Sequence, residues 1–281
     1  MDSGKNPIYG QSNQPNLIPP LEVVYPLDPI TELQLCSSIY IKQEFEFLEK
    51  CCRCETPNRY LIFGNSPQGS KFLFKCREKS GCFMRNCCPA NMKEFDMEIN
   101  HIVFDLQMSS VNEFASFYKP CTISCFCFCM PEIFLTLKNG NILIGSIKQV
   151  YTLYNPEFEI YNSQKKLIFI CTASCCQCGI FCRNYVCGEF SEAVFDIIDP
   201  KTQKIVGQFR KKMTQNLEEL LSKVDNYELI FPMGINGYDK LLLTSLALMI
   251  DYQYFEIEIR KSSKLDKFCD CCCECCCKMC F

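Results

Sequence analysis

Hydrophobic and polar side chains alternate along most of the chain between Leu33 and Phe209, in short runs separated by turn residues. A two-residue period of this kind predicts half-buried β-strands. The pair Asn139-Gly140, between two such runs, is a strong hairpin signal. Four hairpins are predicted in this way, at residues 60–63 with 71–74, 135–137 with 141–144, 158–161 with 167–170, and 195–198 with 204–206. Their regular spacing favours one antiparallel sheet or barrel, and no glycine-rich nucleotide-binding pattern interrupts them.

Two later segments have the pattern of helices. Residues 216–224 begin with a capping signal at Asn216 and Glu219 and place their leucines on one face. Residues 240–251 are apolar on all sides, which is typical either of a core helix or of a membrane span. Their uninterrupted apolar run would be about 15 Å long, whereas a bilayer core is ~30 Å thick. We therefore predict a helix buried in the protein core, with apolar side chains at Leu241, Leu242, Leu243, Leu246, Leu248, Met249 and Ile250.

Composition divides the chain into three parts. Residues 1–30 hold six of the fourteen prolines, which favours a flexible leader that could bind a protein partner through Pro19-Pro20. Residues 31–259 form the predicted barrel domain, including the helix at 240–251. Residues 260–281 form a basic tail, and eight of the last eighteen residues of the chain are cysteine.

Charge and histidine content exclude several classes of function. The net charge of −3 lacks the basic excess of a general nucleic-acid binder. The chain has one histidine, His101, so zinc-protease, Cys-His and Ser-His sites are disfavoured, and we predict no catalytic residue. No apolar segment follows Met1 to form a secretory signal. The 26 cysteines are therefore expected to be reduced thiols that face the cytosol.

Several short segments occur in an order that resembles the phospholipid scramblase family, and the correspondence covers about residues 33–259. The segments are Arg85–Cys88, Cys121–Cys129, Ile144–Gly145, Pro156–Ile160, Cys171–Cys178, Val206–Gly207, Asp225–Pro232 and Leu248–Glu256. The resemblance implies a mainly β fold: a tubby-like antiparallel barrel of about twelve strands around a central C-terminal hydrophobic helix. It also implies calcium-stimulated, ATP-independent movement of phospholipids between leaflets, palmitoylated cysteines and binding to other proteins.

The calcium segment of that family is altered in this chain. The equivalent stretch is residues 223–234, where Lys223 and Gly234 replace the first and last acidic residues of the family pattern. Asp225, Asn226 and Glu228 remain as candidate ligands. Calcium takes six to eight oxygen ligands, so we expect weak Ca²⁺ binding at best. A helix end followed by a strand explains the stretch equally well.

The cysteine-rich segments are candidate sites of palmitate attachment. One acyl chain holds a protein weakly on a membrane and two hold it firmly, since each buried methylene contributes ~0.8 kcal/mol. Phenylalanines alternate with the cysteines in the first segment, as expected of a surface that lies against lipid. The candidate lipidation sites are Cys121, Cys125, Cys127 and Cys129, with Cys269, Cys271, Cys272, Cys273, Cys275, Cys276, Cys277 and Cys280 in the tail.

Metal binding is the alternative for the cysteines. Residues 51–54 and 175–178 each contain a Cys-x-x-Cys spacing, and two such pairs could form a four-sulfur Zn²⁺ site. The tail could hold a soft metal in the same way. Cys36, Cys76, Cys82 and Cys187 are expected to be structural thiols.

Taken together, the sequence predicts a scramblase-like protein attached by acyl chains to a phospholipid membrane, on the cytosolic face of the plasma membrane. It is a lipid translocator in this interpretation and performs no covalent catalysis. The alternatives are a palmitoylated adaptor that moves no lipid and a cysteine-rich metal-binding protein. An endomembrane pool, or a nuclear pool directed by the basic residues 210–212, also stays open.

Overall fold

The computed structural model describes residues 28–44, 57–81, 94–104, 109–120, 130–174, 177, 192–212 and 226–255. Its helical elements are α1 (Pro29–Leu35), α6 (Gly237–Ile250) and the π-helical turn η2 (Asp251–Phe255). Its strands are β1 (Ser38–Glu44), β2 (Arg59–Ser66), β3 (Gly69–Glu78), β4 (Phe95–Phe104), β5 (Ser109–Lys119), β6 (Glu132–Leu137), β7 (Ile142–Val150), β8 (Glu157–Asn162), β9 (Leu167–Thr172), β10 (Ala193–Ile198), β11 (Ile205–Lys212) and β12 (Asn226–Ile230).

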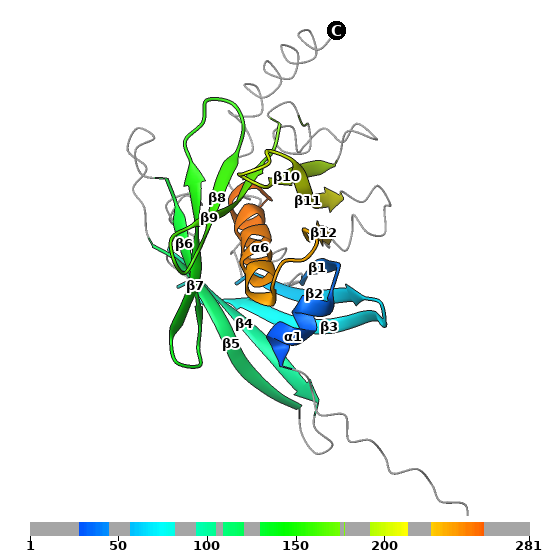
Figure 1. The fold of residues 1–281 in the computed structure, drawn as a ribbon. Helices are drawn as coiled ribbons and strands as arrows, with labels where there is room; N and C mark the ends of the chain where they lie inside the picture. The colour runs from blue at the N-terminus through cyan, green and yellow to red at the C-terminus, as the bar shows by residue number, and fades with distance from the viewer. Residues whose placement is uncertain are drawn as a thin grey trace, which may run out of the picture.

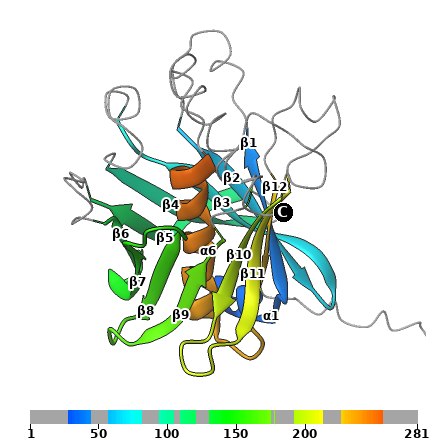
Figure 2. The same ribbon diagram turned by 90° about the horizontal axis from the view of Figure 1, so that it is seen from above.

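The twelve strands form a closed antiparallel barrel, in which each strand pairs with its neighbours in sequence and β1 closes the ring against β12 (Figures 1 and 2). Irregularities in register, for example between Ile62 and Phe63, increase the local bend that closure requires. Buried and half-buried residues alternate along β2, β8 and β10 because one face of each strand points into the barrel. The predicted fold class and all four predicted hairpins are confirmed.

Helix α6 runs through the middle of the barrel (Figure 2). Every residue from Lys240 to Ile250 is buried, which confirms the prediction of a core helix with apolar residues on all sides. The helix starts at Gly237, three residues earlier than predicted, because the Asn236 side chain accepts a hydrogen bond from the Asp239 backbone N–H at 2.8 Å and caps it. No helix in the described ranges has both the length and the apolar character needed to cross a membrane.

Helix α1 was not predicted, and it corrects the boundary of the leader. Pro29 and Ile30, which we assigned to the leader, belong to α1, and Ile30 is part of the hydrophobic core. A Cβ atom on Gly237 would lie 2.5 Å from the Ile30 carbonyl oxygen, so glycine lets α1 pack directly on the first turn of α6. The Lys240 Nζ donates hydrogen bonds of 2.6 Å to the carbonyl oxygens of Gln34 and Cys36, which fix α1 in place.

The antiparallel order gives the barrel two distinct ends. We call the end where the odd-numbered strands β1 to β11 finish, and where α6 passes into η2, the tail end. We call the opposite end, where α1 packs on the start of α6, the α1 end. The connections at the α1 end are the link from α1 to β1, the hairpin turns that follow β2, β6, β8 and β10, the link between β4 and β5, and the link from β12 to α6. Every connection from an odd-numbered strand to the next strand starts and finishes at the tail end.

Candidate functional site

The cysteines are divided between the barrel wall and the connections at the tail end. Cys36, Cys76 and Cys171 are buried, reduced thiols among the described residues. All other cysteines lie in the sequence between β1 and β2, β3 and β4, β5 and β6, or β9 and β10, or after Phe255. The described residues that flank each of these segments lie at the tail end. If these cysteines are acylated as predicted, their acyl chains would therefore be attached to the chain next to the tail end of the barrel.

Several predicted residues lie outside the part of the chain that the structure describes. They are residues 1–27 of the leader, the helix at 216–224, the cysteine pairs at 51–54 and 175–178, Cys82, Cys187, Asp225, and the twelve lipidation candidates Cys121, Cys125, Cys127, Cys129, Cys269, Cys271, Cys272, Cys273, Cys275, Cys276, Cys277 and Cys280. Palmitoylation and zinc binding at these positions stay predictions. Within the described ranges, no three His, Cys, Asp or Glu side chains are grouped in a way that could hold a metal ion.

A buried polar cluster holds the end of α6 against the barrel wall at the tail end. The Asp251 carboxylate, only 2% exposed, accepts a hydrogen bond of 2.5 Å from the Tyr60 hydroxyl on β2 and another from the Tyr227 hydroxyl on β12. The Lys211 Nζ on β11 donates to the Tyr227 oxygen at 3.1 Å and lies 4.2 Å from the centre of the Phe255 ring. Three strands thus fix the point from which the chain continues beyond Phe255.

The position of Lys211 corrects one interpretation of residues 210–212. The sequence leaves open that these three basic residues direct a nuclear pool. The Lys211 side chain is only 4% exposed and points into the barrel, where it contacts Tyr227 and Phe255. In a strand, neighbouring side chains face opposite sides of the sheet, so Lys211 does not share an exposed surface with Arg210.

The two calcium candidates that the structure includes lie on β12. Asn226 is paired across the sheet with Lys42 and Lys212, and Glu228 is paired with Arg210. Directly paired residues of neighbouring strands have their side chains on the same face. Calcium needs six to eight oxygen ligands, whereas Glu228 has the cationic Arg210 as its direct neighbour on β11. Asp225 and the side chain of Asn226 lie outside the part of the chain that the structure describes, so weak calcium binding at this stretch stays a prediction.

The buried thiols are poor nucleophiles and poor metal ligands in the folded protein. Burial raises the pKa of the Cys76 and Cys171 thiols well above the ordinary value, because the thiolate would lose its hydration. Burial also raises the pKa of Cys36, although the nearby Lys240 opposes this effect. Since the thiolate is the reactive form, these three cysteines act as small hydrophobic residues.

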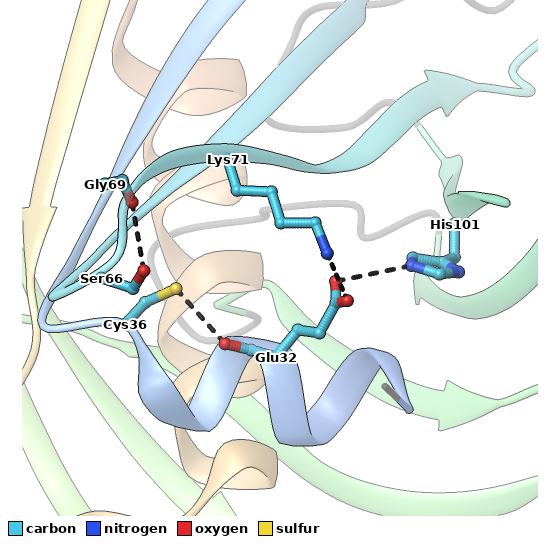
Figure 3. A network of polar contacts seen from close by, with 6 residues as sticks. All are labelled: Glu32, Cys36, Ser66, Gly69, Lys71 and His101. Atoms are coloured by element: carbon cyan, nitrogen blue, oxygen red, sulfur yellow. Dashed lines mark hydrogen bonds and ion pairs between the residues drawn. The ribbon is translucent and has the colours of Figure 1, made fainter. Parts of the chain in front are cut away.

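A second polar cluster lies at the α1 end and was not predicted (Figure 3). The buried Glu32 carboxylate on α1 accepts a hydrogen bond of 2.5 Å from the Lys71 Nζ on β3, and its other oxygen lies 3.8 Å from the His101 Nε2 on β4. The Cys36 thiol donates to the Glu32 carbonyl oxygen at 3.3 Å. The contacts of Glu32 with Lys71 and His101 attach α1 to the barrel wall. The single histidine of the chain therefore lies beside the Glu32 carboxylate of α1.

Comparisons with known proteins identify the family of this chain. The family model described as Scramblase matches residues 19–257. Phospholipid scramblase 2 of Bos taurus is 26% identical over 86% of this chain and 75% of its own length, and phospholipid scramblase 1 of Rattus norvegicus is 24% identical over 85% of this chain and 64% of its own length. Human phospholipid scramblase family member 5 is 23% identical over 86% of this chain and 81% of its own length. A search of solved structures gave no match.

Proposed function

Because the chain belongs to the scramblase family, we propose that it moves phospholipids between the two leaflets of a membrane, in both directions and without ATP. The match of the family model to residues 19–257 carries this proposal. Facilitated transfer of this kind needs neither a nucleophile nor a bound nucleotide, which agrees with a sequence that has one histidine and no phosphate-binding glycine pattern. We give calcium no step in the proposal, since Lys223 and Gly234 replace two acidic residues of the family's calcium segment.

Attachment to the membrane is the second part of the proposal. Palmitate on cysteines of the 121–129 segment and of the tail would hold the protein on the cytosolic face of the plasma membrane. The fold supports this model because Lys119 and Glu132, which flank the first segment, and Phe255, which precedes the second, all lie at the tail end. Acyl chains at the two segments would then attach the same end of the barrel to one leaflet.

Lipid movement is tested by reconstitution of the full chain into vesicles that carry a fluorescent phospholipid in both leaflets. Dithionite, which reduces only the outer leaflet, should bleach about half of the fluorescence in empty vesicles and clearly more in vesicles with the protein. We expect the same result with calcium and with a calcium chelator, because Lys223 and Gly234 replace two acidic residues of the family's calcium segment. Equal bleaching with and without protein would refute lipid movement, and bleaching only with calcium would refute its independence of the ion.

The filled interior of the barrel favours a second candidate function, that of an acylated adaptor that moves no lipid. Every residue of α6 from Lys240 to Ile250 is buried inside the barrel. The adaptor would recruit protein partners through the proline-rich leader. Binding of protein partners by a chain that stays on the vesicles but leaves the two leaflets distinct would support this second candidate.

A further inference from the structure

The connection between β7 and β8 presents a group of exposed apolar side chains at the tail end. Tyr151 is 50% exposed, Leu153 is 76% exposed and Tyr154 is 75% exposed. No charged residue occurs from Tyr151 to Pro156. Single exposed apolar residues are common on soluble proteins, whereas several on one short uncharged loop mark a surface that meets another apolar phase.

The loop is a folded structure that holds these side chains outward. The Thr152 hydroxyl donates a hydrogen bond to the Asn155 carbonyl oxygen across the bend. Pro156, at the other end of the loop, is buried, and its carbonyl oxygen accepts a hydrogen bond from the Ala173 backbone N–H at 3.1 Å. The three exposed side chains therefore need little ordering when they bind, which lowers the entropic cost of binding.

Three contacts place the loop beside the starts or ends of the cysteine-rich segments. The Gln149 N–H donates to the carbonyl oxygen of Pro131, which follows the 121–129 segment by two residues. Ala173, bound to the far end of the loop, comes just before the cysteines that begin at 175. The Gln149 side chain donates to the Tyr254 hydroxyl at 2.8 Å, next to the last described residue of the chain.

The chemistry of the loop fits the interface of a lipid bilayer. Tyrosine is enriched at this depth because its ring is apolar and its hydroxyl can remain hydrated, and leucine reaches the acyl chains. The exposed apolar residues at the α1 end are arranged differently. They are divided among several elements: Ile142 and Leu143 begin β7, Ile205 begins β11, and Leu35, Met233 and Tyr238 lie on α1, on the link from β12 to α6 and on α6. Exposed lysines lie in the turns before β7 and β11, at Lys138, Lys201 and Lys204.

We propose that Tyr151, Leu153 and Tyr154 insert into the interfacial region of a phospholipid bilayer and orient the barrel with its tail end against the membrane. The inference rests on the proposed function, since it requires that the protein binds a phospholipid surface. It adds a binding element that is independent of acylation and that defines which end of the barrel meets the lipid.

Tryptophan fluorescence gives a direct test, because the chain has no tryptophan and each substitution creates a single emitter. Leu153→Trp and the control Met233→Trp, which replaces a 99% exposed residue at the α1 end, are made in the acylated full-length chain. Both are floated with vesicles of phosphatidylcholine and phosphatidylserine, with or without bromine on the acyl chains. We expect blue-shifted emission and quenching by brominated lipid for Leu153→Trp, and neither effect for Met233→Trp.

Each outcome of the fluorescence test decides the inference. Flotation of both variants without a spectral change at position 153 would overturn it and leave membrane attachment intact. Quenching at position 233 alone would place the α1 end against the lipid and would also overturn it. Failure of both proteins to float would overturn the inference together with the proposed membrane attachment.

A binding measurement tests the contribution of the loop by itself. Thioester-linked acyl chains are removed with hydroxylamine, and Leu153→Asp is compared with Met233→Asp for partition into the same vesicles. Loss of one interfacial leucine should lower the partition coefficient of Leu153→Asp about ten-fold. Met233→Asp should bind like the unchanged protein, and equal binding by both variants would contradict the role of the loop.

Discussion

The hydrogen bond between Tyr60 and Asp251 gives the sharpest prediction about stability. The Tyr60 side chain is 0% exposed, and its hydroxyl lies 2.5 Å from a carboxylate oxygen that is 191 residues away in the sequence. Tyr60→Phe removes only the hydroxyl and keeps the ring in the core. A hydrogen bond to a charged group contributes about 1.5–3 kcal/mol, so the free energy of unfolding should fall by about that amount. In a domain of this size the melting temperature should fall by about 3–12 °C.

Tyr161→Phe is a matched control for this substitution. The Tyr161 hydroxyl also donates to a carboxylate, Glu159 at 2.6 Å, but the pair is only half-buried and lies within one strand. Water can replace this bond after the substitution, so the loss should be below about 1 kcal/mol. Urea unfolding followed by far-ultraviolet circular dichroism measures both variants, since the chain has no tryptophan. Equal losses for the two variants would refute the claim that burial makes the Tyr60 bond stronger.

A double-mutant cycle separates the bond from other effects of the substitution. Asp251→Asn is combined with Tyr60→Phe, and the coupling free energy should be about 1–3 kcal/mol because the two side chains are in contact. Coupling below about 0.5 kcal/mol would mean that the two residues contribute independently. The end of α6 would then be held mainly by the packing of its apolar residues.

Other predictions concern protonation, thiol reactivity and packing. Burial raises the pKa of Tyr254 from 10.0 to about 12, so the folded protein binds this proton more tightly than the unfolded chain does. The free energy of unfolding, measured with urea, should therefore fall as the pH rises from 10 towards 12. Tyr254→Phe should weaken this pH dependence. Cys76 and Cys171 should react with N-ethylmaleimide only after unfolding, as read by peptide mass spectrometry, and labelling in the native protein would contradict their burial. Leu243→Ala should lower the free energy of unfolding by about 2–5 kcal/mol in the same urea assay, whereas Leu143→Ala, at an exposed strand position, should change it by only ~0.5 kcal/mol.

Local patterns in the sequence were sufficient to predict the hairpins and α6. The Asn139-Gly140 turn joins β6 and β7 as expected, with Gly140 at φ +80° and Asn141 at φ +50°. These features depend on neighbouring residues only, and two-residue alternation is a strong signal when one strand face is buried. The uniform apolar character of α6 was equally informative, because its length excluded a membrane span.

Features that depend on distant residues were missed. Helix α1 has seven residues, too few for a clear period, and it is held by Gly237 and Lys240 at the opposite end of the sequence. The inward position of Lys211 depends on the barrel register and on the Tyr227 and Phe255 rings beside it. No local pattern shows whether a charged strand residue faces the solvent or an interior partner.

The buried position of α6 also limits how a phospholipid could pass the protein. A route through the barrel would require the helix to leave its place, which would expose seven large apolar side chains that are at most 1% exposed. Each such side chain contributes about 1.5–3 kcal/mol when buried, so the total is on the order of 10–20 kcal/mol. This is comparable to or larger than the whole stability of a typical domain, about 5–15 kcal/mol, and the barrel would unfold before it opened. If the protein moves phospholipids as proposed, we therefore expect the movement to take place on the outside of the barrel, with the tail-end loop at residues 151–156 meeting the bilayer.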